Sequence, residues 1–315
     1  MTDILVIKTS SLGDVIHQMP ALTEARARLP QARFTWLVEE AYAPLVALHP
    51  AAGVVIPVAW RRWRHALASG TTWREFAERR RELRERSYDV VVDTQGLIRS
   101  ALIARSALGP RHGYDRGSIR EPLASRFYDV THTVSRDLHA VDRNRILTGK
   151  ALGYEPDGAP DYGLDRSALR DGTERYAVLL HATARPEKEW PVASWIALGR
   201  LIESRGIKLV LPWGNDGERV RAERIAYALN HARVAERMPL DQMAKLIAGA
   251  EFVVGVDTGL VHLAAALGVP LAAIFAGSEP ALTRPVGQGP IAVVGAKGSS
   301  PSLDEVRAAL DDLLR

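Results

Sequence analysis

The chain has no cysteine among its 315 residues, which excludes disulfide bonds and thiolate metal sites. It also has no uninterrupted apolar run long enough to cross a bilayer, and Lys8 interrupts the first apolar run with no small-residue cleavage site after it. We therefore expect a protein that is soluble or only peripherally attached to a membrane. Its 47% hydrophobic and 25% charged residues are typical of a globular chain, and its length suits two domains.

The net charge of +4 is unevenly distributed along the chain. Residues 1–150 contain 23 Lys and Arg against 16 Asp and Glu, a balance of +7, whereas residues 151–315 contain 18 against 21, a balance of −3. Residues 60–87 alone contain nine Arg and four Glu. Such a run usually forms only a solvated helix face. Because the excess lies in one half, it favours an anionic partner, which is phosphate, nucleic acid or a membrane surface.

Both halves of the sequence alternate between apolar β-branched runs and amphipathic segments. In the first half, the patterns predict strands at 4–8, 33–38, 53–58 and 88–96, and helices at 14–28, 72–86, 98–107 and 137–152. Residues 153–167 are rich in Gly, Pro and Asp and are typical of a linker. The alternation then restarts, with strands expected at 176–182, 207–213, 251–257 and 270–276, and helices at 192–204, 216–230, 239–250, 259–268 and 303–315. Apolar strands between helices indicate parallel sheets, so we predict an α/β protein with two doubly wound, Rossmann-like domains facing a central cleft.

The second half carries neither a G-x-G-x-x-G fingerprint nor a Walker loop, so neither a dinucleotide site nor a P-loop is supported. A different phosphate site is indicated by Asp257, Thr258 and Gly259, which lie between a predicted strand and a predicted helix. The free N–H groups and the dipole of such a helix attract phosphate. The alternative is an ordinary helix cap formed by Asp257 or Thr258. His262 lies one turn inside the helix among Leu and Ala, which favours a buried structural histidine over a ligand.

Two more strand ends carry polar or aromatic side chains. Thr183, Arg185 and Lys188 follow one strand, and Trp213 and Glu218 follow the next. Ligands bind at the carboxyl ends of parallel strands, where a lysine neutralises a diphosphate and a Trp–Glu pair flanks a base or a ribose. The alternative for Lys188 is that it is simply solvated. Together the three strand ends predict a nucleotide site.

Asp14 follows the small polar loop after the first strand, and two roles are open for it. Asp is a favoured N-cap, so the carboxylate would cap the helix expected at 14–28. Near a helix N-terminus the carboxylate would also be held ionised, which suits a general base facing the cleft. The roles coexist only in part, because a capping oxygen is already occupied.

Several segments resemble one family in order along nearly the whole chain: KTSSLGDVIHQMPAL, WLVEE, RRWR, DTQGL, REPLAS, HATARPEKEWP, LPWG and VDTGLVHLAAALGVP. They are similar to the ADP-heptose:lipopolysaccharide heptosyltransferases, glycosyltransferase family nine, and the KTSS loop resembles the type I more than the type II enzymes. The resemblance implies a GT-B fold, with an acceptor-binding domain over 1–160, an ADP-heptose-binding domain over 168–300, and a C-terminal helix at 303–315 packed back on the first domain. It also implies inverting transfer of L-glycero-D-manno-heptose from ADP-heptose to the inner Kdo of Kdo2-lipid A, in lipopolysaccharide inner-core synthesis.

The resemblance further implies roles for individual residues. Asp14 matches the catalytic base. The positions that match donor contacts are Thr183, Lys188, Glu218, Met238, Asp257, Thr258, Gly259 and His262. The positions that match the acceptor side are Ser10, Ser11, Arg61, Arg62, Arg64 and Arg120. The chain departs from the family pattern at Ala184, where a second Thr is common, and at His65, where a Lys is common.

The resemblance implies a peripheral enzyme on the cytoplasmic face of the bacterial inner membrane, with no required cofactor and no essential metal, and no D-x-D motif is present. We expect contact with anionic lipid through Arg61–Arg64 and Arg79–Arg81, with Trp60 or Trp63 exposed. Domain closure on the donor is expected, with 153–167 as the hinge. The alternatives are a type II or other nucleotide-sugar transferase, a nucleotide-sugar-binding protein without turnover, and a nucleic-acid binder, which lacks a motif here.

Overall fold

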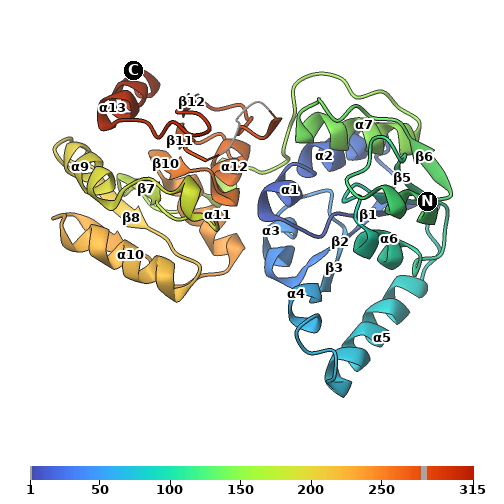
Figure 1. Cartoon of the computed structure of the whole chain (residues 1–315). Coiled ribbons are helices and arrows are strands. Elements are labelled where there is room, and N and C mark those ends of the chain that lie inside the picture. The colour runs from blue at the N-terminus through green and yellow to red at the C-terminus, as the bar shows by residue number, and fades with distance from the viewer. Residues whose placement is uncertain (1, 278–281) are drawn as a thin grey trace. The chain divides into compact units, whose positions relative to one another are not determined.

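The computed structural model describes residues 2–277 and 282–315, and the chain divides into two compact units between Gly163 and Leu164 (Figure 1). This boundary falls inside residues 153–167, the segment predicted to be a linker. Each unit contains one parallel sheet with its own hydrophobic core.

The first unit has a six-stranded parallel sheet with the strand order β3-β2-β1-β4-β5-β6. Its strands are β1 (Asp3–Ile7), β2 (Arg33–Glu39), β3 (Val54–Val58), β4 (Val90–Asp93), β5 (Arg111–Tyr114) and β6 (Val130–His132). Helices cover both faces, so Ile4, Leu5, Val6 and Ile7 of β1 are fully buried. The strand order reverses between β1 and β4, and such a switch point is where open α/β sheets bind ligands.

The second unit repeats this topology with the order β12-β11-β10-β7-β8-β9. Its strands are β7 (Tyr176–Leu180), β8 (Lys208–Leu211), β9 (Ala232–Val234), β10 (Phe252–Val256), β11 (Leu271–Ile274) and β12 (Ile291–Val294). The switch point here lies between β7 and β10, which pair in parallel. Both units are therefore Rossmann-like, as predicted.

The helices connect and cover these strands. In the first unit they are α1 (Leu12–Ile16), α2 (Met19–Arg28), η1 (Glu40–Tyr42), α3 (Ala43–Val46), α4 (Trp60–Trp63), α5 (Gly70–Arg84), α6 (Ile98–Ala104), η2 (Pro122–Phe127) and α7 (Ala140–Leu152). In the second unit they are α8 (Arg166–Leu169), η3 (Pro186–Lys188), α9 (Val192–Glu203), α10 (Asp216–Tyr227), α11 (Leu240–Gly249), α12 (Gly259–Ala266) and α13 (Leu303–Leu313).

The single helix predicted over 14–28 is two helices in the structure. α1 ends at Ile16 and α2 begins at Met19, with Pro20 at the start of α2. Proline lacks an N–H and its ring clashes with the carbonyl four residues earlier, here that of Ile16, so a continuous helix cannot pass this point. The break leaves α1 as a short helix that carries Asp14 near its N-terminus.

The C-terminal helix α13 belongs to the second unit, and its packing back on the first domain stays a prediction. It packs on β11, β12 and α9. Val306 and Leu310 are 0% and 2% exposed in the core of that unit. The amphipathic pattern correctly predicted this helix, and its apolar residues pack on elements of its own unit.

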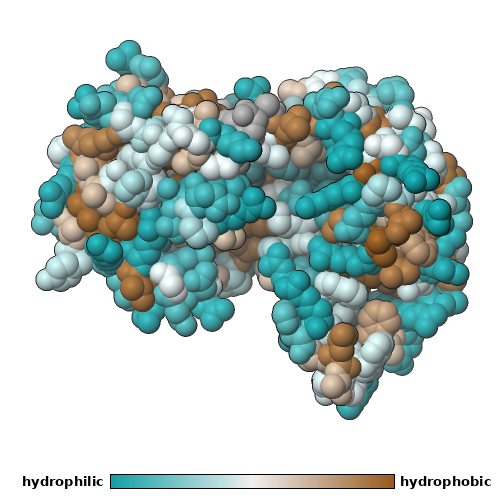
Figure 2. All heavy atoms as spheres, viewed as in Figure 1, coloured by the Kyte–Doolittle hydropathy of each residue, from teal (hydrophilic) through white to brown (hydrophobic). Residues whose placement is uncertain are grey.

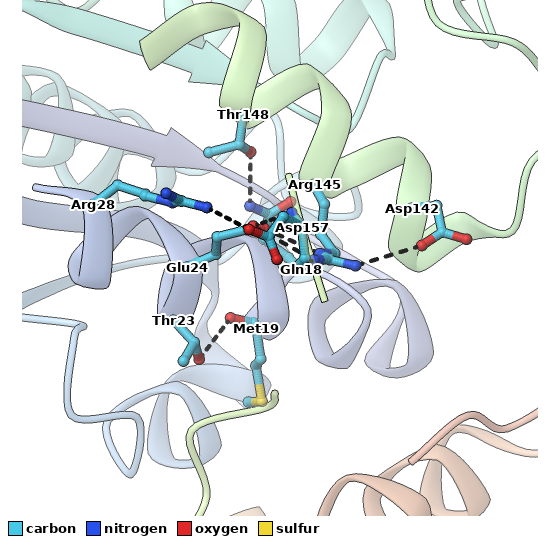
Figure 3. A network of polar contacts seen from close by, with 9 residues as sticks. All are labelled: Gln18, Met19, Thr23, Glu24, Arg28, Asp142, Arg145, Thr148 and Asp157. Atoms are coloured by element: carbon cyan, nitrogen blue, oxygen red, sulfur yellow. Dashed lines mark hydrogen bonds and ion pairs between the residues drawn. The ribbon is translucent and has the colours of Figure 1, made fainter. Parts of the chain in front are cut away.

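The connector after α7 is tied to the first unit by the polar network in Figure 3. Arg145 Nε lies 3.1 Å from Glu24 Oε2 on α2, and Arg145 Nη2 donates to the carbonyl oxygen of Asp157 at 2.5 Å. The N–H of Asp157 donates to Glu24 Oε1 at 2.8 Å. Further along, Gly163 has φ +65°, and a Cβ there would lie 2.8 Å from His49 Nε2. Much of the segment expected as a hinge is therefore fixed to the first unit.

Candidate active site

The loop after β1 is held by the loop after β4. Gln95 Oε1 accepts hydrogen bonds from the N–H of Thr9 at 2.9 Å, the N–H of Ser10 at 3.0 Å and the hydroxyl of Thr9 at 3.3 Å. Arg99 Nη2 donates to Ser10 Oγ at 2.8 Å. Because β1 and β4 are parallel neighbours, their carboxyl ends meet at the switch point of the first unit. The loop that carries Ser10 and leads to Asp14 is thus fixed by several short bonds.

Asp14 is half-buried and lies at the third position of α1, whereas the N-cap is Ser11. Asp14 Oδ2 accepts from the Ser11 N–H at 2.8 Å and from Ser11 Oγ at 3.0 Å, which forms a capping box. Oδ1 accepts no hydrogen bond from any residue that the structure describes. The carboxylate therefore divides the two roles that the sequence left open, because one oxygen stabilises the helix start and the other is available to a ligand.

A buried lysine directly after β1 supports this loop. Lys8 is 6% exposed, and its Nζ donates to the Thr94 carbonyl at 2.8 Å and to Asn144 Oδ1 at 3.3 Å. Burial lowers the pKa of Lys8, while the negative charges of Asp14 and Asp93 oppose that shift. Burial in turn raises the pKa of Asp93. The interior behind Asp14 therefore holds a buried amine and a buried carboxyl group, and burial disfavours the charged form of each.

Beside this loop the first unit has an open groove of about 560 Å³. Its lining residues are Trp60, Leu97, Ile98, Arg99, Leu102, Arg120 and Glu121. Arg99 both lines this groove and bonds Ser10, so the groove lies next to the loop that leads to Asp14. A groove with two arginines and apolar walls suits an acidic ligand that also has apolar parts.

The other arginines predicted on the acceptor side lie at α4. The Arg61 N–H donates to Glu39 Oε1 at 2.9 Å, and its guanidinium bonds Tyr42 Oη at 2.5 Å. Burial raises the pKa of Glu39 despite this hydrogen bond. Arg62 pairs with Glu40 at 3.2 Å and with Glu75 at 2.9 Å. Arg64 is exposed beside His65. Arg62 is thus largely neutralised, while Arg64 and Arg120 are open to solvent.

In the second unit, the predicted donor residues meet at the ends of β7 and β10. Thr183 Oγ1 donates to the carbonyl oxygen of Asp257 at 3.0 Å. Lys188 Nζ lies 2.5 Å from Asp257 Oδ2, with 18% and 9% of the two side chains exposed. This is a largely desolvated ion pair at the switch point. An anion placed there would compete with Asp257 for the ammonium.

Helix α12 starts next to this pair. Thr258 is its N-cap, with φ −143°, and makes no side-chain capping bond. Gly259 is the first helical residue, and the first N–H groups of a helix have no partner within it. A Cβ at Gly255 would lie 2.7 Å from Val261 Cγ1, so the glycine lets α12 approach β10 closely. His262 is 7% exposed inside the helix, as expected for a buried histidine.

The remaining predicted donor residues follow β8 and β9. Glu218 binds the turn before α10, since Oε2 accepts from the Gly214 N–H at 2.7 Å and Oε1 from Asn215 Nδ2 at 2.8 Å. A carboxylate has about four lone-pair sites, so Glu218 can still accept from a hydroxyl group. Trp213 is fixed by a bond from Nε1 to the Ala235 carbonyl at 2.7 Å. Met238 is half-buried in the loop before α11.

Sequence reasoning missed Gln95, Arg99 and Lys8. Gln95 and Arg99 follow β4, the strand that pairs with β1, so strand adjacency is the signal that would have found them. Arg221 was also missed; it donates to the carbonyls of His181 and Trp190.

Within residues 2–277 and 282–315, no three His, Asp or Glu side chains gather closely enough to hold a metal ion. In the same part of the chain, no helix is both long and apolar enough to cross a bilayer.

The two sets of residues offer complementary chemistry. The first unit presents a carboxylate with an open oxygen, and the second presents an ammonium, a hydroxyl and a helix N-terminus. Carboxylates accept protons from hydroxyl groups, and cations with N–H groups stabilise charge on a departing diphosphate.

Comparison with known proteins points to one family. Residues 76–310 match the model of glycosyltransferase family 9 (heptosyltransferase). Lipopolysaccharide heptosyltransferase 1 of Salmonella typhimurium is 42% identical over 96% of this chain and 96% of its own length. The Pseudomonas aeruginosa protein of the same name is 47% identical over 90% and 81%. Lipopolysaccharide heptosyltransferase 2 of Escherichia coli is 28% identical over 90% of this chain and 85% of its own length, so the chain is more similar to these two type 1 proteins.

Solved structures agree with this relationship. The structure of E. coli heptosyltransferase WaaC with ADP has a TM-score of 0.93 and 39% identity, covering 99% of this chain and 100% of that one. The same E. coli protein with ADP-2-deoxy-2-fluoro heptose has a TM-score of 0.90 and 40% identity, covering 99% of each chain. The predicted α/β class, with the two Rossmann-like domains of a GT-B enzyme, is confirmed.

Proposed function

Because the chain belongs to glycosyltransferase family 9, the heptosyltransferases, we propose that it transfers L-glycero-D-manno-heptose from ADP-heptose to the inner Kdo of Kdo2-lipid A. The observation that carries the proposal is the pair of switch points, with an available Asp14 oxygen at one and the Lys188–Asp257 pair beside α12 at the other. ADP and an ADP-heptose analogue are bound by the E. coli relative, which supports the donor.

The proposed reaction is a single in-line displacement with inversion at the donor carbon. Asp14 Oδ1 takes the proton of the acceptor hydroxyl, whose oxygen attacks the anomeric carbon. The bond from that carbon to the diphosphate breaks, and ADP leaves with the electron pair. A positioned general base contributes roughly 10²–10⁴-fold.

Negative charge grows on the diphosphate as it departs. Lys188, the N–H groups at Thr258 and Gly259, and the Thr183 hydroxyl once it turns from the Asp257 carbonyl would stabilise it. Such electrostatic stabilisation usually contributes most. In this account binding of the donor draws Lys188 toward the phosphates. The Asp257 carboxylate, released from the pair, would then contact the donor heptose.

The same account assigns the remaining predicted residues. Glu218 would bind the ribose and Met238 would pack on the adenine, with His262 close to the donor heptose. On the acceptor side, Arg120 and the newly found Arg99 line the groove beside Ser10, while Ser11, Arg61, Arg62 and Arg64 would complete a surface for the acidic Kdo and phosphates. Metal independence and a place on the cytoplasmic face of the inner membrane stay predictions; retention of turnover in excess chelator checks the first.

The test is acceptor-dependent ADP release from ADP-heptose and Kdo2-lipid A, with Asp14→Asn and Asp14→Ala beside wild type. Asn still accepts the two Ser11 bonds, so it preserves the cap and removes only the base. If Asp14 is the base, both variants lose roughly 10²-fold or more. Near wild-type turnover of Asp14→Asn would leave Asp14 as only a cap.

The wild type itself decides between the remaining functions. Acceptor-dependent ADP from ADP-heptose supports the transferase. Binding of ADP-heptose without any ADP release, with the acceptor present, would favour a nucleotide-sugar-binding protein. Faster turnover with another nucleotide sugar or with a heptosylated acceptor would favour another specificity in the same fold.

A further inference from the structure

Helix α5 separates its charges onto two faces. Glu75, Glu78, Glu82 and Glu85 recur at intervals of three or four residues, so they share one side of the helix. Trp73, Ala77, Arg80, Arg81 and Arg84 recur at the same intervals on another side. The helix therefore presents arginines and an aromatic ring together, with its acidic residues turned to a different face.

The basic face carries an exposed apolar tip. Leu67 and Trp73 are 60% and 58% exposed, which is high for large apolar side chains. Trp73 is held in place, because its Nε1 donates to the Leu67 carbonyl at 2.8 Å and its ring meets the Phe76 ring edge-to-face at 6.2 Å. Phe76 in turn contacts the buried Trp63 at 5.9 Å. The tip, Leu67 with Trp73, is thus an apolar wedge attached to the core through Phe76 and Trp63.

A shallow, mainly apolar hollow of about 640 Å³ lies beside the wedge. Its lining residues are Trp73, Phe76, Ala77, Arg80, Arg81 and Arg84. Figure 2 shows hydrophobic residues among hydrophilic ones over the part of the surface formed by α4 and α5. The surface therefore combines apolar area with cations along one side.

The cations of this face are not neutralised by the protein. Arg80, Arg81 and Arg84 form no ion pair with any residue in 2–277 or 282–315. Arg79 instead pairs with Glu82 at 2.5 Å. This set of unpaired arginines differs from the set predicted from the sequence, which placed the lipid contact at Arg61–Arg64 and Arg79–Arg81 with Trp60 or Trp63 exposed. Trp63 is 4% exposed and bonds Glu75, and Trp60 is half-buried in the groove that Arg99 lines. Trp73 is the tryptophan of this region that reaches furthest into solvent.

We propose that this face of α5, with the turn that carries Leu67, docks on an anionic phospholipid bilayer. The arginines would lie among the lipid phosphates while Leu67 and Trp73 insert at the interface, where tryptophan is favoured. An apolar wedge beside the cations fits a bilayer better than a nucleic-acid backbone, which offers no apolar counterpart to Leu67. The inference rests on the proposed function in one respect, because docking on a bilayer would bring the enzyme to a lipid-linked acceptor.

The experiment is sedimentation of the full chain with vesicles, without any substrate. One set is phosphatidylcholine alone, and the other contains about one third phosphatidylglycerol. The wild type should bind the anionic vesicles and lose that binding as salt rises. The triple variant Arg80→Gln/Arg81→Gln/Arg84→Gln should bind roughly 100-fold more weakly, since each arginine contributes about fivefold. The triple Lys variant, which keeps the charge, should bind like wild type.

The matched control is Arg105→Gln/Arg126→Gln/Arg136→Gln, which removes the same charge from exposed arginines elsewhere in the unit. Trp73→Ser should weaken binding at unchanged charge. Equal losses in the two triple variants, or equal binding to both kinds of vesicle, would overturn the proposal. The proposal would also be overturned if the wild type bound nucleic acid but no vesicles, and the triple Gln variant of α5 lost that nucleic-acid binding. ADP release by the wild type tests the proposed function separately, because vesicle binding needs no turnover.

Discussion

Replacing Arg145 with Met should destabilise the first unit strongly, because Arg145 neutralises a carboxylate that is itself nearly buried. The Arg145 and Glu24 side chains are 8% and 13% exposed, and Nε lies 3.1 Å from Glu24 Oε2. The same guanidinium donates to the Asp157 carbonyl, so the substitution also leaves that oxygen without this donor. The change removes the bonds from Arg145 on α7 to Glu24 on α2 and to the connector (Figure 3).

Removing one partner of a buried pair costs about 3–5 kcal/mol. Glu24 keeps its hydrogen bond from the Asp157 N–H at 2.8 Å, so we expect a loss near 3 kcal/mol, at the low end of the ~3–5 range. For a unit of this size, a loss of about 3 kcal/mol lowers Tm by roughly 6–12 °C.

Calorimetry and urea unfolding of the full chain measure this loss. Arg28→Met is the matched control, because Arg28 pairs with Asp157 at 3.1 Å while the two side chains are 46% and 76% exposed. Such a pair contributes only about 0–1 kcal/mol. The double variant Glu24→Leu/Arg145→Met removes both charges and should recover much of the stability. Equal losses for Arg145→Met and Arg28→Met, or strict additivity in the double variant, would refute the reasoning.

Three further outcomes are expected. Burial lowers the pKa of His49 to about 4 from its ordinary 6.5, so on acidification the unfolded chain takes up the proton before the folded chain does. The free energy of unfolding should therefore fall by up to about 3 kcal/mol as the pH drops from 6.5 to 4. Urea unfolding should show a shallower dependence on pH for His49→Gln than for wild type. Lys188→Met should lower kcat for heptose transfer by roughly 10²–10³-fold in steady-state assays, because charge develops on the diphosphate in the transition state. Gly255→Ala should weaken ADP binding by about 1–3 kcal/mol, because the added methyl group pushes Val261 and α12 away. Titration calorimetry measures this loss. Gly70→Ala is the control and should leave ADP binding unchanged, because open space surrounds Gly70.

The sequence by itself determined the class of fold and most of its central elements. Continuous apolar runs such as Val90–Val92 can be buried only between two layers of helices, which is why parallel strands could be predicted from them. The short strands β5, β6, β9 and β12 were missed. β5 begins with Arg111 and His112, and β6 is largely exposed, so neither carries an apolar run.

The sequence also determined which polar residues gather at the switch point of the second unit. Parallel strands end on the same edge of a sheet, so Thr183, Lys188 and Asp257 were expected together before any distance was known. Their contact at 2.5–3.0 Å follows from that topology. The family motifs identified the same positions independently.

Only the tertiary structure decided how each side chain is used. The pattern around Asp14 is the same for a cap and for a base, and it took the Ser11 bonds to show that one oxygen caps while the other is open. Likewise Trp63 and Trp73 are equivalent in a basic run, yet one packs in the core and the other reaches solvent. The physical reason is that a local pattern specifies periodicity, whereas burial and pairing depend on neighbours that are distant in the chain, as Gln95 is from Thr9.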